Sequence, residues 1–207
     1  MSQSSANGTL DGPVGKIEFK IDYPKTASDA VVIISHPHPL YGGSMDNKVV
    51  YTIARACNMS GLIALRFNFR GVGKSQGKHA AGVGEKQDLG AIIKYAEDKF
   101  AGMNVALAGF SFGAAISLAV ANDAPYKFLL TVAPPIYDEI KPITNIICPW
   151  GFFMGEADEV LAVSEVKNWL KQQQNSPQQY WFNNTGHFFH GGLIDLRTRI
   201  IEFIKSL

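Results

Sequence analysis

Two kinds of hydrophobic pattern alternate along the chain. Short, mostly apolar runs predict β-strands. The predicted strands cover residues 16–23, 30–35, 62–67, 104–109, 127–132, 150–154 and 178–183. Residues 31–34 and 62–65 are apolar without alternation, which is typical of strands covered on both faces in a mostly parallel sheet.

Between these runs, apolar residues recur every three or four positions, as on one face of a helix. The recurring sets are Val49, Val50, Ile53 and Cys57; Leu89, Ile92, Ile93, Ala96 and Phe100; Val163, Val166 and Leu170; and Leu193, Leu196, Ile200, Ile204 and Leu207. Strands that alternate with helices predict an α/β domain with right-handed crossovers. Ligands bind beyond the carboxyl ends of the strands in such sheets, so the loops after the strands are the places to search for a site.

The composition fits one domain with a large core. Of its 207 residues, 46% are hydrophobic and 18% are charged. A chain of this length is too short for two full hydrophobic cores. Residues 1–13 are polar and glycine-rich, so we expect a flexible N-terminus followed by a single domain over residues 14–207.

Charge and targeting features narrow the possible partners. The net charge of +1 gives no electrostatic reason to expect nucleic acid or an anionic membrane as partner. No apolar run reaches the roughly 18 residues of a membrane-spanning helix, and the N-terminus lacks the features of a secretory signal. The two cysteines, Cys57 and Cys148, are expected to be reduced, which suits a cytoplasmic location. The sequence leaves the oligomeric state open.

The loop after the strand at 104–109 carries the first chemical signal. Residues 109–113 read Gly-Phe-Ser-Phe-Gly, with Ser111 at the centre and a helical pattern beginning at Phe112. A serine that projects above a sheet sits on a tight strand-to-helix turn, where a Cβ two residues to either side would collide with neighbouring backbone. Ser111 is therefore the candidate nucleophile.

A serine hydroxyl needs a base, and the base needs an orienting carboxylate. On this kind of scaffold the chain order is serine, acid, histidine. Of the two histidines after Ser111, His187 follows a predicted strand and is preferred to His190. Asp158, in the loop after residues 150–154, is the preferred acid.

Other interpretations of this acid remain open. Glu156 comes very soon after the strand, and Glu159 is expected to belong to the next helix. Asp158 itself could instead be the N-cap of that helix.

These segments together resemble the α/β-hydrolase superfamily. The resemblance rests on residues 109–113, 154–160 and 186–189, and on the Arg-Gly-x-Gly-x-Ser loop within residues 66–75. Residues 36–47, His-Pro-His-Pro-Leu-Tyr-Gly-Gly-Ser-Met-Asp-Asn, resemble a small subgroup of lidless serine hydrolases. The resemblance implies a three-layer fold with helices on both faces of a mostly parallel sheet. It also implies a hydrolase with a Ser-His-Asp triad that needs no metal or organic cofactor.

Acyl transfer also requires two N–H donors for the developing oxyanion. One is expected to be the N–H of Phe112, the residue after the nucleophile. The second is expected from the loop that begins at His36. Since Pro37 and Pro39 have no N–H, the choice falls on His38, with Leu40 second.

The substrate is expected to be a small carboxylic ester or thioester. Only residues 133–149 separate two predicted strands at the point where many relatives carry a helical cap, so no cap domain is expected. Tyr41 and Phe110 are candidates for lining an acyl pocket. Arg70 is expected to brace its own loop, although it could also attract an anionic substrate group.

Three alternative functions are weighed against hydrolysis by serine. Gly73-Lys74-Ser75 resembles the end of a phosphate-binding loop, but Asn68 stands where that motif needs glycine. His36-x-His38 has a spacing found in some metal sites, but no acidic cluster follows it. The third alternative is a non-catalytic binding module that retains the hydrolase scaffold.

Overall fold

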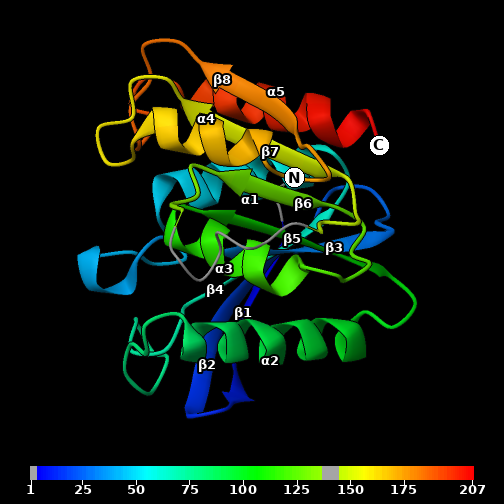
Figure 1. Ribbon diagram of the computed structural model, residues 1–207. Coiled ribbons are helices and arrows are strands. Elements are labelled where there is room, and N and C mark those ends of the chain that lie inside the picture. Colours follow the sequence, from blue (N-terminus) through cyan, green and yellow to red (C-terminus); the bar gives the residue numbers. More distant parts are fainter. Residues whose placement is uncertain (1–3, 137–144) are drawn as a thin grey trace.

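A computed structural model describes residues 4–136 and 145–207 of the chain (Figure 1). Eight strands form one sheet in the order β1-β2-β4-β3-β5-β6-β7-β8. The strands are β1 (Ser5–Gly12), β2 (Gly15–Asp22), β3 (Ala30–Ser35), β4 (Ile63–Phe67), β5 (Asn104–Phe110), β6 (Leu129–Val132), β7 (Trp150–Gly155) and β8 (Gln178–Phe182). The pairs β1–β2 and β2–β4 are antiparallel, and every other pair is parallel.

Helices cover both faces of this sheet (Figure 1). The helices are α1 (Lys48–Met59), α2 (Val83–Lys99), α3 (Phe112–Ala121), α4 (Val163–Lys171) and α5 (Leu193–Lys205), with a short 3₁₀ turn, η1 (Pro39–Tyr41). One apolar cluster joins α2, α3 and α4 to the sheet, and a second joins α1 and α5 to the opposite face. This is the three-layer α/β fold that the sequence predicts, and the described residues include no cap domain.

The expectation of a flexible N-terminus over residues 1–13 is wrong for most of that segment. β1 pairs with β2 along its whole length, from Ser5 opposite Asp22 to Gly12 opposite Gly15. β1 is an edge strand made mostly of polar residues, so backbone hydrogen bonds hold it in place and its sequence carries little hydrophobic signal. The pairing extends the sheet on the side away from the candidate site.

Both cysteines are free thiols buried in the protein, as expected for a reduced chain. Burial raises the pKa of the Cys57 thiol to about 12 and also raises that of Cys148. Since the thiolate is the reactive form of cysteine, neither residue is a candidate nucleophile.

Candidate active site

Ser111 occupies a strained turn between β5 and α3. Its backbone has φ 52° and ψ −122°, a conformation that L residues rarely adopt. A Cβ on Gly109 would overlap the carbonyl group of Gly113, and a Cβ on Gly113 would overlap the carbonyl group of Ser35. The two glycines therefore permit the close backbone approach that holds Ser111 above the carboxyl edge of the sheet.

Three side chains from three loops form a hydrogen-bonded series. Oγ of Ser111 lies 3.0 Å from Nε2 of His187, and Nδ1 of His187 lies 2.8 Å from Oδ2 of Asp158. The side chains of His187 and Asp158 are almost completely buried. Since a carboxylate only accepts, Nδ1 carries the proton and Nε2 is left to accept the hydroxyl proton of Ser111. The three residues chosen from the sequence thus lie together at one edge of the sheet, after β5, β7 and β8.

Asp158 occupies the position of the acid in this series, and it is not the N-cap of α4, which is Ala162. While Oδ2 bonds to His187, Oδ1 accepts the backbone N–H groups of Val160 and Leu161 at 2.9 and 2.8 Å. Because α4 begins only at Val163, these bonds close a turn ahead of the helix and do not cap its first residue. The turn fixes the carboxylate in the orientation that the imidazole requires.

Glu159 accepts a hydrogen bond from the backbone of His187, a role that the sequence did not indicate. Its Oε2 accepts the backbone N–H of His187 at 3.0 Å, and a Cβ on Gly186 would overlap this same oxygen. The expectation that Glu159 belongs to the following helix is wrong. Glu156, by contrast, pairs at the surface with Lys167.

The loop after β3 narrows the choice of oxyanion donors. The N–H of Leu40 donates to Nδ1 of His38 at 3.2 Å, which removes Leu40 from the candidates. The N–H groups of Tyr41 and Gly43 both donate to the carbonyl oxygen of His38 at 3.1 Å. Within the described residues, the N–H groups of His38 and Phe112 have no acceptor. These two N–H groups therefore remain as the candidate oxyanion donors near Ser111, which shares a hollow with His38.

His36 fixes this loop to the rest of the protein. The ring is fully buried, with Nδ1 2.6 Å from the carbonyl oxygen of Pro37 and Nε2 accepting the N–H of Phe69 at 3.0 Å. Burial lowers the pKa of His36 to about 4. With both ring nitrogens engaged, His36 has no lone pair for a metal, and no group of metal ligands occurs among residues 4–136 and 145–207.

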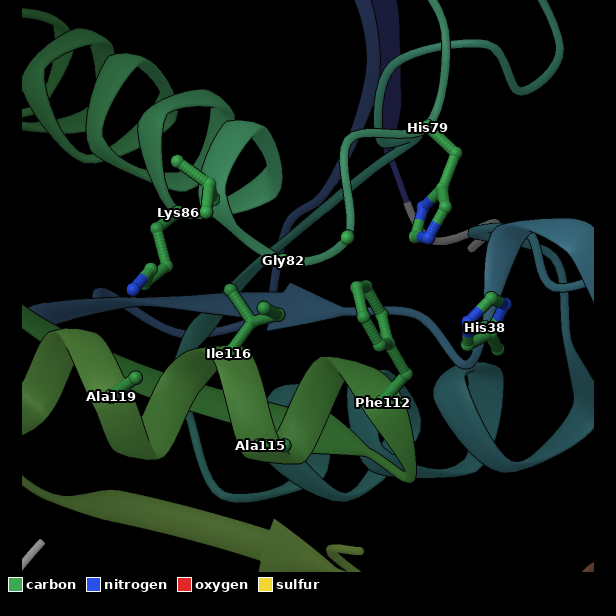
Figure 2. Close-up of a pocket in the computed structure, with 10 residues that line it drawn as sticks. His38, His79, Gly82, Lys86, Phe112, Ala115, Ile116 and Ala119 are labelled. Atoms are coloured by element: carbon green, nitrogen blue, oxygen red, sulfur yellow. The ribbon is translucent and has the colours of Figure 1, made fainter. Parts of the chain in front are cut away.

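Two hollows lie near the proposed oxyanion donors, and Ser111 lines one of them. One, of about 240 Å³, is lined by Ser111, His187, Tyr41, Val160, Phe188 and neighbouring residues of the β3 loop. The other is an apolar groove of about 280 Å³ between α3 and the start of α2 (Figure 2). His38 lines both hollows, and Figure 2 shows it at one end of the groove, beside Phe112.

The two pocket residues chosen from the sequence have different positions. Tyr41 is 87% exposed at the rim of the hollow that contains Ser111. Phe110 was wrongly assigned to the pocket. Its side chain is completely buried, lines neither hollow and packs behind the ring of His187, with 5.2 Å between ring centroids.

Arg70, in the loop after β4, has a structural partner in Asp88. Nε and one terminal nitrogen of Arg70 donate to the two oxygens of the buried Asp88 at 3.0 and 2.8 Å. These bonds raise the pKa of Arg70. Arg70 therefore braces its own loop, as expected, and the partner that holds it is the carboxylate of Asp88. After Lys74 the chain continues as a loop until α2 begins at Val83, so the helix of a phosphate-binding loop does not follow.

Comparison with known proteins agrees with this geometry. A family model described as serine aminopeptidase, S33, of the Hydrolase_4 family matches residues 26–150. The chain belongs to this family of α/β hydrolases. An uncharacterized protein of Rickettsia prowazekii is 34% identical over 96% of this chain and 85% of its own length.

Two solved structures share nearly the whole of the hydrolase fold. An α/β serine hydrolase homologue from Coxiella burnetii is 42% identical, with a TM-score of 0.94 over 98% of each chain. A serine hydrolase without a lid from Xanthomonas campestris is 36% identical, with a TM-score of 0.93 over 100% of this chain and 96% of its own. These relatives agree with the expected lidless subgroup. In the described part of this hydrolase, every helix is too short or too polar to cross a bilayer.

Proposed function

We propose that this α/β hydrolase cleaves small carboxylic esters or thioesters through an acyl-enzyme intermediate. The observation that carries the proposal is the 3.0 Å separation between Oγ of Ser111 and Nε2 of His187. A serine hydroxyl becomes a competent nucleophile at neutral pH only when such a base accepts its proton. The burial of the imidazole and its bond to Asp158 favour one tautomer and one orientation of that base.

In the first step, Oγ of Ser111 attacks the substrate carbonyl carbon while Nε2 of His187 accepts the hydroxyl proton. The carbonyl oxygen becomes an oxyanion between the N–H groups of Phe112 and His38. Asp158 stabilises the imidazolium that forms. The tetrahedral species then collapses: the bond to the leaving group breaks, and His187 gives its proton to the departing alkoxide or thiolate.

The second step repeats this chemistry with water. His187 takes a proton from a water molecule, the resulting hydroxide adds to the acyl carbon, and Ser111 leaves with the proton returned to it. The products are a carboxylic acid and the free enzyme. The open site, with Tyr41 exposed at its rim, favours short acyl groups over the long chains that a cap would shelter.

Covalent labelling tests the nucleophile directly. The purified protein is incubated with a fluorophosphonate probe, and intact mass and peptide mapping locate the adduct. We expect one adduct on Ser111, its loss in Ser111→Ala, and its retention in Ser164→Ala, which changes an exposed serine of α4. A wild-type protein that does not label would favour the non-catalytic binding module instead.

A panel of p-nitrophenyl esters tests the substrate class. Acetate and butyrate are expected to be hydrolysed with higher kcat/KM than dodecanoate or palmitate, and Ser111→Ala is expected to lower kcat by several orders of magnitude. Faster turnover of the long chains would contradict the open site. Turnover of aminoacyl p-nitroanilides in place of esters would contradict the proposed ester class.

A further inference from the structure

The groove between α2 and α3 has one apolar floor and one cation (Figure 2). The floor consists of side chains from successive turns of α3, namely Phe112, Ala115, Ile116 and Ala119. No residue of α3 is charged. Phe112 and Ala119 are seven positions apart, so the floor is about 10 Å long at a rise of about 1.5 Å per residue. This shape fits an extended chain of methylene groups.

The position of His187 determines which part of an ester enters the groove. The leaving group must lie within reach of Nε2 of His187, because that nitrogen protonates it. His187 lines the hollow with Tyr41 and Phe188 and does not line the groove. With the carbonyl oxygen held at Phe112 and His38, the leaving group is directed toward His187. The groove along α3 is the other hollow that His38 lines, and it would take the acyl chain.

Lys86 stands at the opposite end of the groove from His38. Figure 2 shows its side chain extending from α2 over the face of α3, close to Ala119. No described carboxylate forms an ion pair with its ammonium group. Its neighbour Glu85 is turned inward, where its two oxygens accept the N–H groups of Ala80 and Gly82 and one lies 2.9 Å from Nδ1 of His79. The distal end of the groove is therefore cationic.

We propose that the groove is an acyl-binding site for chains that end in a carboxylate, a proposal that rests on the function proposed above. The substrate is then a half-ester or half-thioester of an aliphatic dicarboxylic acid. Its reacting carbonyl lies at Ser111, its methylene groups lie on Phe112, Ile116 and Ala119, and its free carboxylate pairs with Lys86. The distance along α3 selects a diacid of intermediate length.

The kinetic test compares matched acyl chains. Mono-p-nitrophenyl esters of succinic, adipic and suberic acids are assayed beside the uncharged p-nitrophenyl heptanoate. In the wild type, kcat/KM for the adipate or suberate half-ester is expected to exceed that for both heptanoate and the succinate half-ester. The advantage over heptanoate is expected to be about threefold or more, the upper range for a partly exposed ion pair, and to shrink in high salt.

Substitution of Lys86 assigns this preference to the groove. Lys86→Met keeps the length of the side chain and removes its charge, so the ratio of kcat/KM between the adipate half-ester and heptanoate is expected to fall to about one. Lys86→Glu is expected to invert the ratio. Lys94→Met is the matched control, because Lys94 lies on α2 outside the groove and pairs with Asp98; its ratio is expected to equal that of the wild type.

Failure of this inference is distinguishable from failure of the proposed function. Ser111-dependent hydrolysis of all the esters, with a ratio near one in the wild type and unchanged in Lys86→Met, overturns the groove assignment and leaves the hydrolase function intact. Absence of all ester hydrolysis overturns both. Calorimetric binding of the adipate half-ester to Ser111→Ala, and its weakening in Ser111→Ala/Lys86→Met, provides a readout that needs no turnover.

Discussion

Glu159 holds the backbone of His187 through a single hydrogen bond, from the N–H of His187 to Oε2 at 3.0 Å. This carboxylate touches neither the imidazole nor Ser111, so its effect on chemistry acts only through the position of the base. Proton transfer is sensitive to displacements of less than an ångström. The bond therefore connects a side chain outside the reacting groups to the rate of the reaction.

Glu159→Ala is expected to lower kcat about tenfold, which corresponds to about 1.4 kcal/mol of activation free energy, with little change in KM. Steady-state kinetics on p-nitrophenyl butyrate measure both constants. Glu156→Ala is the matched control, because Glu156 pairs only with Lys167 at the surface, and it is expected to behave as the wild type. Equal kcat values for the two variants would contradict a positioning role for Glu159.

Two substitutions of Asp158 are expected to separate its effect on kcat from its effect on the free energy of unfolding. Asp158→Asn keeps an oxygen for the N–H groups of Val160 and Leu161 but presents an NH₂ group to His187, which favours the wrong imidazole tautomer. A fall in kcat of about 10³ to 10⁴ is expected, with a nearly unchanged free energy of unfolding in urea. Asp158→Ala also removes the acceptor of the turn and is expected to lose about 1–2 kcal/mol of stability in addition. Similar stabilities for Asp158→Asn and Asp158→Ala would show that the turn does not depend on Oδ1.

Gly43 contacts the peptide that carries the proposed second oxyanion donor, the N–H of His38. Its N–H donates to the carbonyl oxygen of His38, and a Cβ at this position would overlap the carbonyl group of Pro37. Gly43→Ala is therefore expected to displace the N–H of His38 and to lower kcat about 10²-fold or more, as for the loss of one oxyanion donor.

The matched control for Gly43 is Gly90→Ala, at a helical position where a Cβ meets open space. This variant is expected to keep wild-type kcat and to gain up to about 1 kcal/mol of stability. An unchanged kcat in Gly43→Ala would assign the second donor to another residue.

His36 makes the stability of the fold depend on pH. The folded protein keeps His36 neutral down to a pKa of about 4, whereas the unfolded chain protonates at the ordinary value of 6.5. As the pH falls through this window, the unfolded state binds the extra proton, so the folded state loses stability. The loss attributable to His36 is about 2 kcal/mol between pH 7 and pH 5.

Urea unfolding at pH 7 and pH 5 measures this dependence. His36→Gln is less stable than the wild type at pH 7, because the buried contacts with Pro37 and Phe69 are altered, but its loss of stability on acidification is expected to be smaller by about 2 kcal/mol. The same pH slope in both proteins would mean that His36 is not the group that titrates.

The sequence identified the three side chains of the hydrogen-bonded series because each one follows a predicted strand, and the strands before Ser111 and Asp158 are strongly apolar. Ser111, Asp158 and His187 then lie at the same edge of a parallel sheet in the chain order that the chemistry requires. The helical positions were recognisable for the same reason, since apolar periodicity records which face is buried. These features depend on local pattern and on general rules of topology.

What the sequence did not reveal depends on particular hydrogen bonds and on side-chain orientation, which the hydrophobic pattern does not record. Phe110 lies next to Ser111, but its position in β5 turns it into the core against His187. Leu40 has an N–H, but the ring of His38 captures it. Glu159 accepts a hydrogen bond from His187, 28 positions away, and the edge strand β1 is held by its backbone pairing with β2. Polar residues give no periodic signal for such bonds.

The backbone of Ser111 has a consequence for the thermal stability of the protein. Its dihedral angles, φ 52° and ψ −122°, suit glycine better than serine, and the difference costs about 1 kcal/mol. Replacing Ser111 by glycine is then expected to make the protein more resistant to heat while abolishing ester cleavage. A serine at this position therefore makes the fold less stable than glycine would, and the proposed catalysis gives a reason for that cost.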